Sequence, residues 1–265
     1  MSAPLPLPDR PSAEHLASLR AEVARAREAR GPALAFGIAP IDERLADHGL
    51  DGAGLHEIAA ATASLNDDAA ATLFAAGIAA RFADKPGLTI LWALSKFDLY
   101  APGLEQVGLG PDRILYAQGT KDAQVLAMAE DGLRDGSLAC VIAEVKTADM
   151  TATRRLQLAA SDGRTPILLY RRHRSRERCP LDTLSAAMTR WRIGCAESAR
   201  LPHAGVGRPR WSVELVRQRA GNPFTLELEA CDEQGRLALP AAAADRATAR
   251  GRAVCLLYTS PSPRD

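Results

Sequence analysis

The sequence predicts an α/β fold, with a doubly wound, mainly parallel sheet that a C-terminal antiparallel meander extends. Short apolar runs alternate with helix-length segments as far as residue 170, which is typical of parallel strands joined by crossover helices. Beyond that point apolar and polar residues alternate with a period of two, which is typical of antiparallel strands with one solvated face. With 265 residues, of which 47% are hydrophobic and 25% charged, the composition suits an ordinary globular protein.

The parallel part of the sheet should hold five strands, because five runs are apolar throughout and are bounded by turns or helices. We expect these strands at residues 55–59, 88–94, 113–116, 138–144 and 166–170. Apolar residues at helical spacing predict helices at 41–45, 68–82, 122–134 and 151–160, and a small helix that ends at 104–107.

The C-terminal part shows the alternation of a meander. In the clearest case, Trp211, Val213 and Leu215 share one face of a strand. We expect strands at residues 188–195, 210–216, 224–230 and 236–239, with turns at 220–223 and 232–235.

The two ends of the chain fall outside this pattern. Ser12 can cap a helix over residues 12–30, and Gly31-Pro32 ends it. This helix is either a brace packed on the domain or an arm that binds a partner. Residues 255–265 resemble the translation of a sequencing adapter, and we interpret them as a non-native tail. We therefore expect a helical arm at 1–33, a core with its meander at 34–254, and a tail at 255–265.

Targeting signals and cysteine spacing favour a cytoplasmic protein. No apolar run reaches the length of a membrane span, and the Pro-containing start lacks the apolar core of a signal peptide. No C-x-x-C pair and no histidine at zinc-finger spacing is present, so we expect reduced thiols and no metal site. The five cysteines are Cys140, Cys179, Cys195, Cys231 and Cys255.

The stretch from residue 49 to residue 80 has the strand, loop and helix order of a phosphate-binding P-loop. A working loop reads G-x-x-x-x-G-K-[ST], because backbone N–H groups, the Lys and the hydroxyl hold the phosphates and Mg²⁺. Residues 59–68 contain no Gly and no Lys, and Asn66 and Asp67 stand where the Lys and the hydroxyl residue belong. Acidic residues there cap the helix but repel a triphosphate. We therefore expect a degenerate loop that does not bind nucleotide, marked by Ala60, Leu65, Asn66 and Asp67.

Two features that could suggest chemistry are expected to be structural. His56 lies at the start of a strand, where a histidine more often hydrogen-bonds locally than acts as an acid or base. Trp92, Trp191 and Trp211 lie in expected strands, so we expect them to pack in the core.

Positive charge is concentrated between Gly163 and Arg219. This segment has thirteen Arg, no Lys and four acidic residues, although the whole chain carries a formal charge of only +1. Residues 171–178 alone contain five Arg, whose guanidinium groups suit phosphates and carboxylates. This loop is either solvated or a binding surface for DNA or an acidic partner, and its lack of aromatic residues argues against base stacking. The candidate binding residues are Arg171, Arg172, Arg174, Arg176, Arg178, Arg208, Arg210, Arg217 and Arg219.

Three blocks of sequence carry a family resemblance. They are Phe36-Gly37-Ile38-Ala39-Pro40-Ile41-Asp42 before Gly54-Leu55-His56-Glu57-Ile58, Leu104-Glu105-Gln106-Val107-Gly108-Leu109 before Arg113-Ile114-Leu115, and Gly207-Arg208-Pro209-Arg210-Trp211 before Arg217-Gln218-Arg219-Ala220-Gly221-Asn222-Pro223-Phe224. By their order and spacing, the chain from Leu34 to Leu239 resembles the RecA-like ATPase core. It resembles more closely the ImuA family of damage-inducible mutagenesis proteins, which are related to SulA and RecA.

The resemblance implies that catalysis is lost. The family's phosphate-loop positions hold Asn66 and Asp67, and its water-activating Glu falls near Lys96, which cannot be a base in that role. Glu144 ends a strand where a Walker-B acid would lie, but without Lys or Mg²⁺ ligands we expect a solvated strand-end residue. Since phosphoryl transfer depends on positioning and charge compensation, we expect no enzyme activity and no cofactor.

The resemblance also implies a function and partners. An ImuA protein works in SOS mutagenesis and translesion DNA synthesis with an ImuB-type Y-family-like protein and an error-prone DNA polymerase, and RecA is a further candidate partner. We therefore expect a non-catalytic RecA-like scaffold, cytoplasmic and nucleoid-associated, that bridges these partners and can contact DNA. Two alternatives stay open, namely an ATP-binding RecA-like DNA-repair ATPase and a SulA-like cell-division inhibitor.

Overall fold

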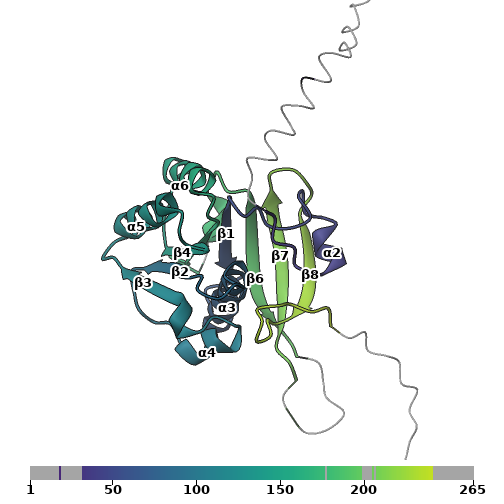
Figure 1. Cartoon of the computed structure of the whole chain (residues 1–265). Helices are drawn as coiled ribbons and strands as arrows, with labels where there is room; N and C mark the ends of the chain where they lie inside the picture. Colours follow the sequence, from purple (N-terminus) through teal and green to yellow (C-terminus); the bar gives the residue numbers. More distant parts are fainter. Residues whose placement is uncertain (1–17, 19–31, 177, 199–204, 206, 241–265) are drawn as a thin grey trace, which may run out of the picture.

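The computed structural model describes residues 18, 32–176, 178–198, 205 and 207–240, which form an eight-stranded sheet with helices on both faces (Figure 1). The strand order is β3-β2-β4-β5-β1-β6-β7-β8. The strands are β1 (Leu55–Ala60), β2 (Ile90–Leu94), β3 (Ile114–Gln118), β4 (Cys140–Val145), β5 (Ile167–Arg171), β6 (Thr189–Ala196), β7 (Arg210–Gln218) and β8 (Phe224–Glu229). The α-helices are α2 (Ala39–Asp42), α3 (Leu65–Phe82), α4 (Ala101–Gln106), α5 (Asp122–Asp135) and α6 (Met150–Gly163), and two 3-10 helices are η1 (Pro111–Arg113) and η2 (Pro180–Asp182).

The predicted α/β class and its five parallel strands are confirmed. β1 lies inside the sheet and pairs in parallel with β5 on one side and with β6 on the other. All six residues of β1 are buried, as expected for a strand that is covered on both faces. Its carboxyl end therefore lies at the middle of one edge of the sheet.

The C-terminal part differs from the prediction in two respects. β6 runs parallel to β1, so only β7 and β8 form the antiparallel extension. The strand predicted at residues 236–239 is wrong, because that segment makes a single bridge between Glu229 and Ala238. Gly235 turns the chain away from β8 and packs against Gly77 of α3, and Leu237 joins the core beneath.

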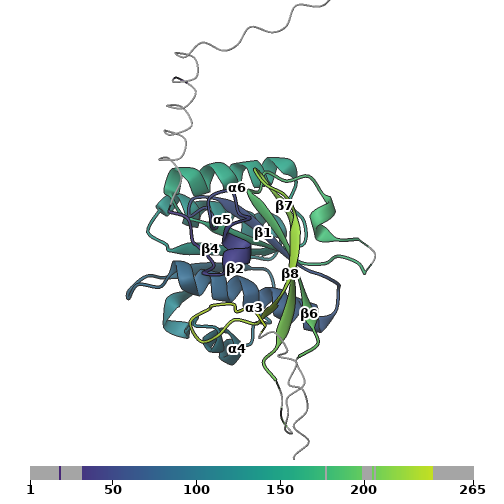
Figure 2. The same ribbon diagram turned by 90° about the vertical axis from the view of Figure 1, so that its right-hand side faces the viewer.

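Two apolar cores lie on the two faces of the sheet (Figure 2). On one face, α3 and α4 cover a core that includes all three tryptophans, which confirms that these side chains pack inside. On the other face, α5 and α6 contribute Val125, Leu133 and Leu156. The helix α3 therefore packs in the core that contains the tryptophans, and its N-terminus lies at the edge where the parallel strands end.

The start of α3 is set by its capping residue. Ser64 has an extended backbone and its Oγ accepts a hydrogen bond of 3.2 Å from the N–H of Asp67. The helix begins at Leu65 for this reason, earlier than the predicted start at residue 68. Asp67 and Asp68 then lie in its first turn, as the sequence predicted.

Some predictions concern residues outside the described part of the chain. The N-terminal helix at 12–30, apart from Ser18, and the tail at 255–265, with Cys255, belong to this group. The four described cysteines are free thiols. Within the described ranges, none of the helices has both the length and the apolar character that a bilayer crossing requires.

His56 of β1 forms two local hydrogen bonds, as predicted. Its Nε2 lies 2.9 Å from the carbonyl oxygen of Asp51, which can only accept, so Nε2 carries the proton. Its Nδ1 then accepts from the Thr189 hydroxyl at 2.8 Å. Burial lowers the pKa of His56, while the hydrogen bond to Asp51 and the charge of Asp51 oppose this shift. The neutral imidazole is therefore the form that the fold selects.

We expect His56 to make stability depend on pH. A histidine whose pKa is lowered by folding stabilises the protein above its unfolded value of 6.5, and this contribution is lost as the pH falls below that value. Urea unfolding from pH 8 to pH 5 should show the wild-type advantage over His56→Gln shrinking by up to about 1.4 kcal/mol per pH unit. Glu144 titrates in both proteins and cancels in the difference. A stability difference that stays constant with pH would contradict this role.

Candidate functional site

The carboxyl ends of the parallel strands meet the N-terminus of α3 around a cavity of about 290 Å³. In open α/β sheets this edge is where ligands usually bind. The cavity is lined by the cap of α3, by the segments that follow β2 and β4, and by the residues after β5. Its charged lining residues are Asp68, Lys96, Asp98, Glu144, Lys146 and Arg172.

Arg172 contacts three carboxylates from three different parts of the chain. Its Nη1 lies 2.8 Å from Asp68 of α3, its Nη2 lies 3.0 Å from Asp98, and its Nε donates to Glu144 of β4 at 2.6 Å. Burial by itself lowers the pKa of Arg172, but the charges of Glu144 and Asp68 outweigh this effect and raise it overall. The guanidinium therefore stays charged and neutralises acids that lie far apart in the sequence.

Glu144 is buried, so the prediction of a solvated strand-end residue is wrong. Its Oε1 accepts from the indole Nε1–H of Trp92 at 2.6 Å, and its Oε2 accepts from Arg172. β4 lies between β2 and β5, and the neighbouring strands cover its end. Burial raises the pKa of Glu144, and the charge and hydrogen bond of Arg172 and the hydrogen bond of Trp92 partly oppose this shift.

The loop between β1 and α3 is closed by hydrogen bonds within itself, to β6 and to the segment after β5. Asp67 accepts hydrogen bonds from the backbone N–H groups of Thr62 at 3.1 Å and of Cys195 at 2.8 Å. The carbonyl of Ala60 accepts from His173 Nε2 at 2.9 Å. Asp67 is therefore turned inward at the position of the P-loop hydroxyl residue, and its oxygens are committed to the fold.

The other predicted loop residues lie at the rim. Leu65 is 86% exposed, and Asn66 is exposed as well. Lys96 follows β2, its side chain is 82% exposed, and its Nζ lies 3.5 Å from Asp98. The sequence did not predict that Arg172, Asp98 and Trp92 lie together at this site. A signal was present for Asp98 and Glu144, because each is an acid at or just after the end of an expected strand.

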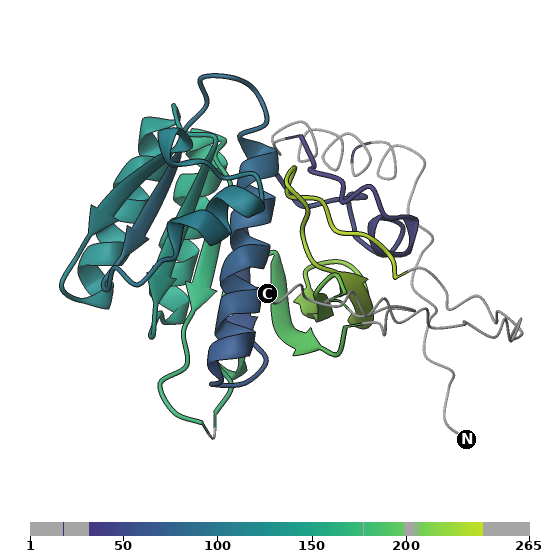
Figure 3. The ribbon, with the colours of Figure 1, turned by 90° about the horizontal axis from the view of Figure 1, so that it is seen from below.

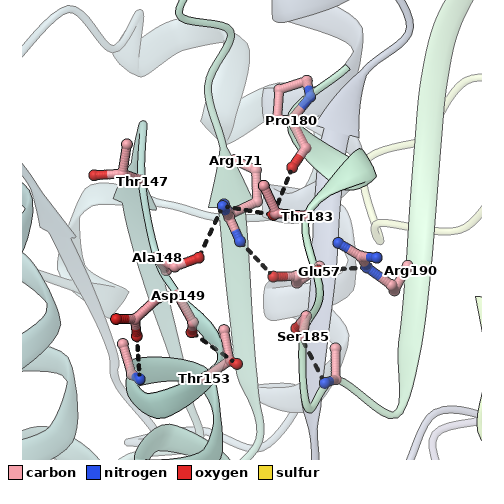
Figure 4. Close-up of polar contacts among 12 residues, drawn as sticks. Glu57, Thr147, Ala148, Asp149, Thr153, Arg171, Pro180, Thr183, Ser185 and Arg190 are labelled. Atoms are coloured by element: carbon pink, nitrogen blue, oxygen red, sulfur yellow. Dashed lines mark hydrogen bonds and ion pairs between the residues drawn. The ribbon is translucent and has the colours of Figure 1, made fainter. Parts of the chain in front are cut away.

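A second charged cluster lies inside the sheet (Figure 4). Glu57 of β1 is fully buried and accepts from Arg171 Nη1 at 2.7 Å and from Arg190 Nε at 2.6 Å. Arg171 also donates to the carbonyl of Ala148 at 3.1 Å and to the Thr183 hydroxyl at 3.4 Å. It therefore joins the two ends of the basic loop, residues 172–182.

Arg171 cannot face a partner, which corrects its prediction as a binding residue. It is 2% exposed, because β5 is central and places its last side chain beside Glu57. Arg172 is engaged as well, with its side chain 20% exposed in contact with three acids. The first two arginines of the predicted basic loop are thus internal.

The remaining arginines separate into three sets. Arg208 pairs with Glu229 and Arg210 pairs with Glu227, both at 3.1 Å, so these two predicted binding residues hold β7 to β8. Arg174, Arg176 and Arg178 are exposed at the carboxyl edge, without a carboxylate within 4 Å in the described ranges. Arg217 and Arg219 are exposed at the opposite edge, where β7 ends beside the start of β6.

The acids of the cavity do not form a metal site. Among the residues that the structure describes, no group of three His, Cys, Asp or Glu is arranged to hold a metal ion. In the cavity itself, the guanidinium of Arg172 occupies the space between Asp68, Asp98 and Glu144.

Comparisons with known proteins point to one family. No protein-family model matches the sequence. Two curated proteins, both named Protein ImuA, come from Caulobacter vibrioides strains NA1000 / CB15N and ATCC 19089 / CIP 103742 / CB 15. Each is 36% identical over 197 residues, which cover 72% of this chain and 81% of the relative. The solved structure of SulA from Pseudomonas aeruginosa matches with 24% identity and a TM-score of 0.37, over 44% of this chain and 96% of SulA.

We expect Arg172→Ala to destabilise the fold by about 3 kcal/mol, because it leaves Asp68, Asp98 and Glu144 without their cation. Urea unfolding followed by tryptophan fluorescence would measure this loss of stability.

Arg176→Ala is the control for this substitution. Arg176 is exposed and has no ion pair in the described ranges, so its removal should change stability by less than about 0.5 kcal/mol. An Arg172→Ala protein as stable as the wild type would show that the cluster does not hold the edge of the sheet.

Proposed function

The chain belongs to the ImuA family, as its sequence motifs predicted, and from this premise we propose that it is a non-catalytic accessory protein of damage-induced mutagenesis. The family resemblance implies the process, translesion DNA synthesis under the SOS response. We also propose that the α/β fold is a RecA-like core. The β1, loop and α3 order of a P-loop and the parallel pairing of β1 with β5 and β6 support it.

The position of Arg172 is the observation that carries the non-catalytic proposal. A P-loop enzyme places phosphates and Mg²⁺ between the loop, the helix start and the acid at the end of the neighbouring strand. Here the corresponding space holds a guanidinium in contact with Asp68, Asp98 and Glu144. The charged lining of this cavity has three acids and three cations, so it offers no net positive charge to a triphosphate.

The basic loop supports a role in binding. Arg171 holds both ends of this loop, and Arg174, Arg176 and Arg178 extend from it with their charges unpaired in the described ranges. Arg208 and Arg210 instead have carboxylate partners on β8. Exposed guanidinium groups on a fixed loop suit an acidic surface, since they can form bidentate contacts with carboxylates or phosphates.

We assign this surface to an ImuB-type Y-family-like protein and an error-prone DNA polymerase, which the family resemblance implies as partners. RecA and DNA are further candidates for the same acidic or phosphate-bearing contact. A scaffold that joins these partners would be associated with the nucleoid.

Replacing Arg174 and Arg176 with Ala should lower the affinity for the ImuB-type partner by about tenfold and reduce its salt dependence, because each lost cation removes a charged contact. Titration calorimetry over a series of salt concentrations would measure both effects. The matched control is Arg154→Ala with Arg164→Ala, which removes the same exposed charge from α6 and its C-cap, away from the predicted binding residues. Equal losses in the two double variants would refute the loop as the contact surface.

We expect no Mg²⁺-dependent binding of a fluorescent ATP analogue, because the loop has neither Lys nor Gly and its Asp67 is committed to backbone N–H groups. Fluorescence anisotropy with and without Mg²⁺ would test this. Saturable, Mg²⁺-dependent binding that Glu144→Gln abolishes would favour the ATPase alternative.

A further inference from the structure

We propose that a second cavity, at the amino edge of the sheet, binds a phosphate-bearing small molecule through Arg81, Arg113 and Arg236. This cavity has a volume of about 500 Å³ and lies at the C-terminal end of α3. It is separate from the cavity around Arg172, which lies at the other end of the same helix.

The walls of this cavity come from four parts of the chain, namely the segment before α2, the end of α3, the turn at Gly108 and the segment after β8. Figure 3 shows the backbone of the fold from below. Gly108 has φ +86° and an added Cβ would lie 2.7 Å from the carbonyl oxygen of Glu233, so the turn and the segment meet backbone to backbone. Gly235, with φ +70°, meets Gly77 of α3 in the same way. These contacts hold the segment after β8 in place.

Two of the three arginines are positioned by backbone carbonyls. Arg113 donates to Gly108 at 3.0 Å and to Ala80 at 3.1 Å. Arg81 donates to the carbonyl of Ala35, and its guanidinium lies 5.9 Å from the centre of the Phe36 ring. Neutral carbonyls orient these groups without cancelling their charge, so both guanidinium groups are oriented before a ligand arrives.

Arg236 completes the set from the segment after β8. Its backbone N–H is held by Asp232 at 2.9 Å, and its side chain is exposed. Within the described ranges, none of the three arginines has a carboxylate within 4 Å, whereas Arg172, Arg208 and Arg210 are paired.

The charged lining of the cavity consists of three arginines and two acids, which gives a net charge of +1. Asp84 and Glu233 also line it, but neither pairs with an arginine of the described ranges. Burial lowers the pKa of Arg81, the positive charge of Arg236 lowers it further, and Cys231, Asp42 and Asp232 oppose these effects. A ligand with a single carboxylate would add only one more group of the kind that Asp84 and Glu233 already supply. A phosphate group carries a charge of about −1.5 to −2 and three acceptor oxygens, so it can serve several guanidinium groups.

The size of the cavity and its apolar wall indicate an organic part in the ligand. Volumes of about 300–1,000 Å³ are usual for small-molecule sites. Leu34, Phe36 and Leu237 line the cavity beside the arginines. We therefore assign it to a phosphate monoester rather than to free phosphate.

The test uses the full chain and two probes, inorganic phosphate and phenyl phosphate, in titration calorimetry at constant ionic strength without Mg²⁺. Phenyl phosphate should bind saturably and more tightly than inorganic phosphate. Arg236→Gln should weaken it at least about tenfold, because a charged hydrogen bond is lost. Asp84→Asn should strengthen it severalfold, because a competing carboxylate is removed.

The matched control is Arg154→Gln, which removes an exposed charge on α6 and should leave the affinity unchanged. Absence of binding, or equal affinities in the wild type and Arg236→Gln, would overturn the proposal. If Arg154→Gln lost as much affinity for phenyl phosphate as Arg236→Gln, the proposal would also fail, because the probe would then be held by non-specific charge attraction. Equal affinity for the two probes would refute the assignment to a monoester.

Discussion

Two neighbouring arginines at the end of β5 hold the carboxyl edge of the sheet together by charge. Because side chains alternate along an extended chain, Arg171 reaches Glu57 on one face and Arg172 reaches Asp68 and Glu144 on the other. These ion pairs join the end of β5 to β1, β4 and α3. An edge that many parallel sheets use for ligands is here occupied by the protein's own side chains.

The same ion pairs explain how a highly charged loop can keep a fixed position at the edge of the sheet. Its first two arginines are committed to buried or partly buried carboxylates, so the chain leaves the sheet from a fixed point. Arg171 also contacts Thr183, where the chain returns, so a short basic segment is closed at its base. The exposed arginines between these points are therefore presented from a stable edge, which is what a contact surface requires.

The two ends of α3 differ in charge. At its N-terminus three acids surround one guanidinium, and at its C-terminus three arginines lie near two acids without pairing with them in the described ranges. Both arrangements agree with the helix dipole, since the N-terminus of a helix favours anions and its C-terminus favours cations. The cluster at the N-terminus is satisfied internally, whereas the cations at the C-terminus keep the capacity to bind an anion.

The α/β class, the order of the elements and the missing phosphate-loop residues could be read from the sequence, because they depend on local periodicity and on residue identity. The sequence could not reveal that Glu144 is buried, that Arg171 points inward or that residues 236–239 do not form a strand. The ion pair between Arg172 and Asp68 joins residues 104 positions apart, and a strand pattern does not reveal whether a neighbouring strand is within reach. The sequence thus determined which charges and elements this protein has, and only the tertiary structure decided which charges meet, because that depends on which distant segments the sheet brings together.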